Sequence, residues 1–274
     1  MSNYMNINLK TVDIQQLIFT LFLTLLVIPS LAFPTQLLAQ TVFPSTTEDN
    51  VTQPSSGAVP EVANPSAPVS SKTTQEQFWT AIKQDDDWAL SNAIYAGASP
   101  TSRLTNGNTA LHQAVDIPSP HTAAMLLRQP GVDINARNNA GETPLMLAVL
   151  RGQIKMVQSL VSAKAAVNHP GWTPLHYAAS ATYEQAPEMI ALLLDNFAYI
   201  DAESPNATTP LMMAARYGSS PNVAVLLESG ADPRLKNHQG LNALDFATAG
   251  AMPDSIAMLS ELLLKMETLP AGTW

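Results

Sequence analysis

Apolar residues along most of this chain recur three and four positions apart, in short segments that come in pairs. One segment places Phe78, Ala81 and Ile82 on a single helix face. The segment after it carries Trp88, Leu90, Ala93 and Ile94, and a later pair carries Leu145, Ala148, Ile154, Val157, Leu160 and Val161. This spacing is typical of amphipathic helices. The pattern therefore predicts an all-α chain built from short antiparallel helix pairs.

A four-residue tag opens one helix of each predicted pair after the first. The tags begin at Thr109, Thr143, Thr173, Thr209 and, in a degraded form, Asn242. They lie 34, 30, 36 and 33 residues apart and read Thr-Ala-Leu-His, Thr-Pro-Leu-Met, Thr-Pro-Leu-His, Thr-Pro-Leu-Met and Asn-Ala-Leu-Asp. A period of this length marks a stack of units in which each unit buries its apolar faces against its neighbours.

The period and the Thr-Pro-Leu-His tag resemble those of the ankyrin-repeat family. The segments at 97–100 and 230–233 are similar to the Gly-Ala-Asp-Pro that closes ankyrin units. The resemblance covers residues 73–266 and implies an ankyrin solenoid of about six helix-turn-helix units with short β-turn or hairpin connections. We expect the units at 73–102, 103–136, 137–167, 168–202, 203–235 and 236–266, and a frayed tail at 267–274. The first and last units diverge most from the family pattern.

The resemblance also implies roles for the tag residues. In the family, the tag's Thr and His bond to backbone groups across the turn, and its Pro starts the inner helix. On this chain the capping residues are Thr109, Thr143, Thr173 and Thr209, the helix starts are Pro144, Pro174 and Pro210, and the residues that join neighbouring turns are His112 and His176. Met146, Met212 and Asp245 stand where His is usual, which weakens the bonding between turns there.

Ankyrin partners lie in the concave groove formed by turn tips and inner-helix faces. On the matching positions of this chain we expect partner contact from Gln113, Leu147, Arg151, Trp172, Tyr177, Met213, Arg216, Tyr217 and Phe246. Aromatic and Arg side chains carry most contact energy in interfaces, which favours Trp172, Tyr177, Arg216 and Tyr217 as the central cluster. For Tyr177 and Phe246 the alternative is that they only pack between inner helices.

The N-terminal residues follow a different pattern. Lys10 precedes an apolar run at 17–28, and Pro29 ends it. This layout is typical of a secretory signal, which we place at 1–39 with cleavage after Ala32 or Ala39. An uncleaved anchor is the alternative, although a spanning helix needs about 20 apolar residues. Residues 40–72 are rich in Pro, Ser and Thr without hydrophobic periodicity, which predicts a disordered tether.

Composition narrows the function. The chain of 274 residues has a net charge of −9 and scattered basic residues, which argues against a nucleic-acid partner. It contains no cysteine, so thiolate metal sites and cysteine nucleophiles are excluded. No phosphate loop, zinc spacing or Gly-x-Ser-x-Gly motif occurs. The acidic run at 85–87 lacks the glycine turn of a calcium loop. We therefore expect no catalytic residue, cofactor or metal.

These observations predict a non-catalytic scaffold that binds an unidentified protein through the concave face, as a monomer. We expect export, with the periplasm of a Gram-negative bacterium as the first expectation and secretion beyond the cell as the second. After signal cleavage no stable membrane insertion is expected. Two alternatives stay open. One is a small-ligand or metal-binding accessory to an envelope enzyme, with the long loop at 181–187 or the irregular last unit as the place for a pocket. The other is a membrane-anchored structural spacer.

Overall fold

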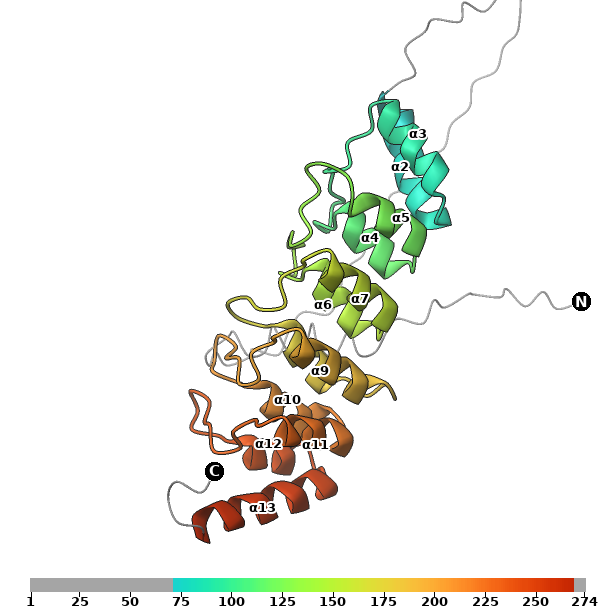
Figure 1. Cartoon of the computed structure of the whole chain (residues 1–274). Coiled ribbons are helices and arrows are strands. Elements are labelled where there is room, and N and C mark those ends of the chain that lie inside the picture. The colour runs from blue at the N-terminus through green and yellow to red at the C-terminus, as the bar shows by residue number, and fades with distance from the viewer. Residues whose placement is uncertain (1–70, 269–274) are drawn as a thin grey trace, which may run out of the picture. The chain divides into compact units, whose positions relative to one another are not determined.

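The computed structural model describes residues 71–268 as six consecutive helix pairs (Figure 1). The pairs are α2 (Ser71–Gln84) with α3 (Asp87–Tyr95), α4 (Ala110–Asp116) with α5 (Pro120–Leu126), α6 (Pro144–Leu150) with α7 (Ile154–Ser162), α8 (Pro174–Ser180) with α9 (Ala186–Asp195), α10 (Pro210–Tyr217) with α11 (Ser220–Glu228), and α12 (Ala243–Ala249) with α13 (Pro253–Thr268). The predicted all-helical stack is confirmed.

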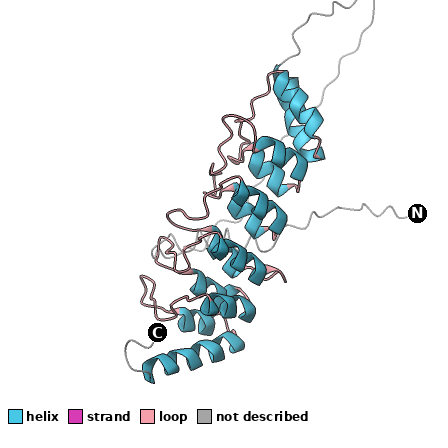
Figure 2. Ribbon diagram, in the orientation of Figure 1, coloured by secondary structure: helices cyan, strands magenta, loops and turns pink. Residues whose placement is uncertain are grey.

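The helices form two rows. The inner row runs α2, α4, α6, α8, α10, α12, and each of its members packs against the next. In the outer row, direct packing joins α3 to α5, α9 to α11 and α11 to α13, whereas contacts of α7 with α5 and α9 are sparse. The long loops between units lie together on one side of the helices (Figure 2). The stack therefore has a continuous inner row and an outer row that opens around α7.

Small side chains allow the inner helices to approach closely. The fifth residue after each tag's first position is alanine in all five tagged units, and each of these alanines is completely buried: Ala114, Ala148, Ala178, Ala214 and Ala247. The leucine of the tag is also fully buried in the four complete tags, at Leu111, Leu145, Leu175 and Leu211. The core is thus a row of leucines and alanines that neighbouring units share.

In units two to five, a side chain from the loop between the two helices, or from the first turn of the outer helix, donates a hydrogen bond to the preceding unit. Ser119 Oγ donates to Ile82 O at 2.8 Å, Gln153 Nε2 to Val115 O at 2.9 Å, and Tyr183 OH to Val149 O at 2.8 Å. Asn222 Nδ2 donates to both Ala179 O and Ala181 O, at 3.1 and 2.8 Å. The longer loop of the fourth unit supplies Tyr183. Ile82 O and Val149 O also accept a backbone N–H, from Asp85 and Gly152 respectively, so at these two carbonyls the side chain adds a second bond.

Several details depart from the sequence interpretation. Within residues 71–268 there is no β-strand, and a single isolated antiparallel bridge joins Arg103 to Thr109 instead of regular hairpins. Helix α2 begins at Ser71, inside the predicted tether, and α13 continues to Thr268, two residues beyond the predicted last unit. Trp88 is 74% exposed. It precedes Leu90 by two positions, which places the two side chains about 200° apart around α3. The predicted signal and nearly all of the tether lie outside the described residues.

Candidate functional site

The tag threonines begin the inner helices. Thr109, Thr143 and Thr209 each have extended backbone angles and accept a hydrogen bond from the backbone N–H three residues on. This satisfies one of the donors that a helix leaves free at its start. The hydroxyls of Thr109 and Thr173 lie 2.8 and 2.9 Å from Nδ1 of His112 and His176 respectively. The prolines Pro144, Pro174 and Pro210 occupy the first helical position, where no backbone N–H is needed.

His112 and His176 each join their own turn to the next. Nδ1 accepts from the backbone N–H of the tag threonine, at 3.3 Å for His112 and 3.1 Å for His176. The proton is therefore on Nε2, which donates to Glu142 O and Thr208 O respectively, both at 2.9 Å. Burial lowers the pKa of His112, and it lowers the pKa of His176 to about 4. Both rings are neutral near pH 7 and fully engaged in backbone bonds, so neither is placed as a base or a metal ligand.

In the third and fifth units a methionine stands at the histidine position and makes only the bond within its own turn. Met146 Sδ accepts from the Thr143 N–H at 3.4 Å, and Met212 Sδ accepts from the Thr209 N–H at 3.5 Å. A thioether has no proton to donate, so neither methionine can bond to the following turn. In the sixth unit an aspartate stands at the histidine position, and Asp245 Oδ2 accepts from the Asn242 N–H at 2.9 Å.

Five of the predicted partner residues occupy one equivalent position, four residues after the first residue of each tag. They form a row along the inner helices and are nearly covered, with exposed fractions of 8% for Gln113, 2% for Leu147, 3% for Tyr177, 1% for Met213 and 6% for Phe246. Their neighbours in adjacent units bury them. Partner contact by these five stays a prediction, and burial restricts it to the small part of each side chain that remains exposed.

The other four predicted partner residues are half-buried and offer more surface. The Trp172 ring meets the His176 ring edge-on, with centroids 5.2 Å apart. Arg151 Nη2 donates to Asp116 Oδ1 at 2.5 Å. The Arg216 guanidinium lies 5.2 Å from the centre of the Tyr217 ring, and burial raises the pKa of Tyr217 to about 12. Each of these side chains is thus held by a neighbour while part of it stays open to solvent.

The expected central cluster is divided between two places. Trp172 precedes α8, whereas Arg216 and Tyr217 end α10, a helix of eight residues that spans about 12 Å. Tyr177 lies on α8 and is buried. Helices α8 and α10 pack against each other, so all four residues belong to one stretch of the inner row. They present two separate contact points there.

Sequence reasoning missed two kinds of residue. Asp116, the ion-pair partner of Arg151, precedes it by 35 residues, close to one repeat, and that interval was an available signal. A polar bridge in which Asn138 Nδ2 donates to Asn108 Oδ1 and Glu142 Oε2, both at 3.1 Å, links two neighbouring turns. Exposed aromatic side chains outside the apolar spacing had no signal in it: Tyr95, Phe197 and Tyr199.

Within residues 71–268 no three His, Asp or Glu side chains gather where they could hold a metal ion. No helix in the same range has the length and apolar character needed to cross a bilayer.

The fold is a solenoid of stacked helix pairs. The family model described as "Ankyrin repeats (3 copies)" matches residues 78–170, 111–204, 164–237 and 180–266, which together span more than half of the chain. The chain belongs to the ankyrin-repeat family. Ankyrin repeats mediate protein–protein interaction.

Known relatives share the repeat region. The mouse nuclear factor NF-kappa-B p105 subunit is 33% identical over 145 residues, which cover 51% of this chain and 15% of that protein. The ankyrin-repeat domain of Bcl-3 is similar in structure, with 30% identity and a TM-score of 0.59 over 67% of this chain and 81% of that one. A chain in a complex of a Bdellovibrio bacteriovorus predatory endopeptidase with an immunity protein has 28% identity and a TM-score of 0.58, over 68% of this chain and 97% of that one.

Proposed function

We propose that this protein is an exported, non-catalytic scaffold that holds a partner protein against its inner row. The observation that carries the proposal is the set of half-buried, pre-positioned side chains on α6, α8 and α10 and their turns: Arg151, Trp172, Arg216 and Tyr217. Tryptophan, tyrosine and arginine are the residues that most often dominate interface energetics. Side chains already held in place lose little freedom when a partner binds.

Export is part of the proposal and is supported by the sequence alone. The apolar run at 17–28, ended by Pro29 and followed by small residues at Ala32 and Ala39, is typical of a cleaved signal. We place the protein in the periplasm of a Gram-negative bacterium, with secretion as the second location. N-terminal sequencing of the exported protein tests this: a start at Phe33 or Gln40 supports cleavage, and a retained N-terminus supports the membrane-anchored spacer.

Affinity capture with matched variants tests the binding face. The full chain, a Trp172→Ala/Tyr217→Ala double variant and a Trp88→Ala control are used as baits under identical conditions. Trp88 is a 74% exposed aromatic on the outer row, so the control removes a comparable surface ring elsewhere. We expect the wild type and the control to recover the same protein and the double variant to lose it. Equal recovery by the double variant, with an unchanged melting temperature, shows that the inner row is not the binding face.

A peptidase is a second, more specific candidate for the partner. The observation that favours it is the likeness to a chain from the complex of a predatory endopeptidase with an immunity protein, which this chain covers over 97% of that chain's length. The experiment adds the purified chain to peptidases of the same cell compartment and follows cleavage of a fluorogenic peptide. Inhibition that saturates at a one-to-one ratio supports this candidate. Unchanged rates at a molar excess of the chain exclude it for each peptidase assayed.

A further inference from the structure

Two exposed aromatic residues stand together at the end of α9. Phe197 is 84% exposed and Tyr199 is 69% exposed. The Phe197 backbone has a φ of 65°, in the left-handed region that bulky residues rarely adopt. Units one and five place Gly97 and Gly230 at this position, with φ values of 101° and 97°. The fourth unit thus exposes an apolar ring in a strained conformation, without any gain in burial for its own fold.

The Phe197–Tyr199 pair is held in place by Asn168, at the start of the same unit. Asn168 Nδ2 donates to Phe197 O at 2.6 Å, and the Tyr199 N–H donates to Asn168 Oδ1 at 2.8 Å. These two bonds clamp the backbone on both sides of the intervening residue. The rings therefore project from a braced loop, and an aromatic side chain presented in this way can bind at a small cost in conformational entropy.

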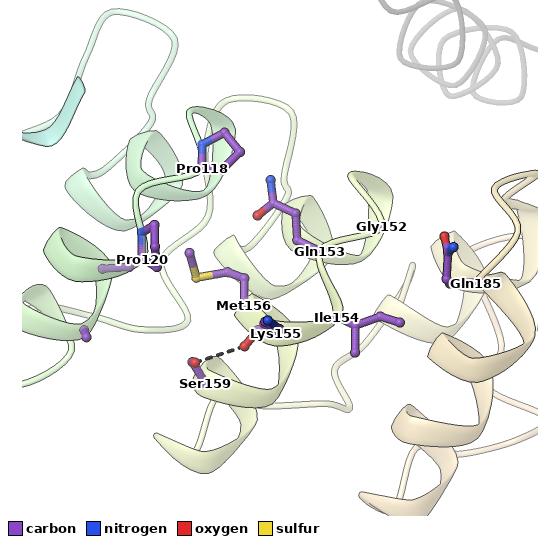
Figure 3. Close-up of a pocket in the computed structure, with 11 residues that line it drawn as sticks. Pro118, Pro120, Gly152, Gln153, Ile154, Lys155, Met156, Ser159 and Gln185 are labelled. Carbon is purple, nitrogen blue, oxygen red and sulfur yellow. Dashed lines mark hydrogen bonds between the residues drawn. The ribbon is translucent and has the colours of Figure 1, made fainter. Parts of the chain in front are cut away.

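The outer row contains an apolar groove where it opens around α7. The cavity has a volume of about 390 Å³, within the size range of small-ligand sites. Pro120, Ala123 and Ala124 of α5 line one side, and Met156 of α7 lines the other and extends toward Pro120 (Figure 3). We call this cavity the α5–α7 groove. Its lining suits an apolar guest of the size of an aromatic ring.

Two polar groups give the α5–α7 groove a chemical preference. Gln153 uses Nε2 to bond Val115 O, while its Oε1 is buried and has no hydrogen-bond partner among the described residues. This orphan oxygen favours a guest with a hydroxyl or N–H donor. Lys155 also borders the groove and is exposed, and within residues 71–268 its ammonium group forms no ion pair. The guest should therefore combine an apolar ring, a proton donor and a nearby negative charge.

The end of α9 carries these same three groups. Phe197 supplies the ring, Tyr199 supplies a phenolic hydroxyl, and Asp195, the exposed last residue of α9, supplies the carboxylate. Within one molecule they cannot enter the groove. Gln185 borders the groove just before α9, whereas Phe197 follows α9, and the ten-residue helix between them spans about 15 Å.

We propose that the Phe197–Tyr199 pair of one copy of this chain inserts into the α5–α7 groove of a second copy. Phe197 packs against Pro120 and Met156, the Tyr199 hydroxyl donates to Gln153 Oε1, and Asp195 faces Lys155. The two contacting surfaces differ, so the contact is head-to-tail and extends to further copies. It is independent of the partner that the inner row binds, and it departs from the monomer expected from the sequence.

The contact is small. Two aromatic side chains bury about 150–250 Å² each, and the matching groove brings the total below the roughly 1,200 Å² of stable interfaces. Association is therefore weak and depends on protein concentration. It is relevant where many copies of the chain are concentrated in one compartment.

Sedimentation equilibrium of the full chain between about 10 μM and about 1 mM tests the proposal in the range where small interfaces associate. Phe197→Gly removes the ring and restores the residue found in units one and five, so the fold is retained. Ala124→Phe fills the α5–α7 groove from the half-buried face of α5. Trp88→Ala removes an unrelated exposed ring as the control.

We expect the average mass of the wild type and of Trp88→Ala to rise above the monomer with concentration, and each of the other two variants to remain monomeric. An equimolar mixture of Phe197→Gly and Ala124→Phe should form dimers, because one variant retains the groove and the other retains the aromatic pair. Any of three results overturns the proposal: a monomeric wild type throughout, association of either single variant like the wild type, or a mixture that stays monomeric.

Discussion

The bond from His176 to the next turn can be measured by exchanging the residue for the one that other units use. In His176→Met the tag becomes Thr-Pro-Leu-Met, as in the third and fifth units. Those units show what is retained, because Met146 Sδ and Met212 Sδ still accept the threonine N–H at 3.4 and 3.5 Å. The Nε2–H bond to Thr208 O, 2.9 Å long in the wild type, is lost.

The expected loss in the free energy of unfolding depends on which hydrogen bonds remain after His176 is replaced. Thr208 O still accepts the Ser204 N–H at 3.0 Å, so it is not left without a partner. The net loss is one buried hydrogen bond, and we expect His176→Met to lower the free energy of unfolding by about 1 kcal/mol. His176→Ala also loses the bond from the Thr173 N–H and leaves a cavity at a side chain with no exposed surface, so its expected cost is about 3 kcal/mol.

Urea unfolding followed by circular dichroism measures both variants together with the reciprocal Met146→His. The reciprocal change adds an Nε2–H donor to the third unit and should raise the free energy of unfolding by about 1 kcal/mol. The reasoning is refuted if His176→Met is as stable as the wild type while His176→Ala is not. It is equally refuted if the methionine and alanine variants lose the same free energy, since that would assign the whole effect to ring packing.

Three further predictions concern the same stack. His176 has a pKa of about 4 when folded and 6.5 when unfolded, so the unfolded state binds more protons between these two pH values. The free energy of unfolding should therefore fall by about 3 kcal/mol as the pH drops from 6.5 to about 4. Urea unfolding measured over this pH range should show that His176→Met lacks this loss. Asn222→Ala removes a fully buried donor to Ala179 O and Ala181 O and should cost about 2 kcal/mol in urea unfolding; no loss would show that water replaces the amide. Gly250→Ala brings a Cβ within 2.5 Å of Arg216 O and should lower stability by about 2 kcal/mol in a thermal melt, and an unchanged melting temperature would contradict the close packing of the last two units.

The sequence was most informative where a residue type has a single local role. A threonine before a proline and a leucine indicates a helix start, because the hydroxyl caps and the proline needs no donor. The regular recurrence of this signal was sufficient to predict the paired helices and that they stack on one another. The role of the shared alanines, such as Ala148, could be recognised only from the structure. Their small side chains matter because they let the neighbouring helix approach closely, and the sequence of one helix does not show this.

The candidate site was less accessible to sequence reasoning. A position on an inner helix says which way a side chain points, but its exposure depends on the size of its neighbours in two other units. Tyr177 and Met213 point along the inner row and are covered, whereas Arg151 and Trp172 remain partly open. Phe197 escaped notice because it lies in a loop, where hydrophobic periodicity carries no information. The absence of the glycine found in other units was its one signal.

Four hydrogen bonds from the loops between helices, or from the first turn of an outer helix, run in one direction, from a later unit to the unit before it. A chain that emerges from a ribosome, or from a translocation pore with its N-terminus first, therefore completes each unit only when the following one arrives. The donors are Ser119, Gln153, Tyr183 and Asn222 in turn, so each of the first four junctions between units uses a different side chain.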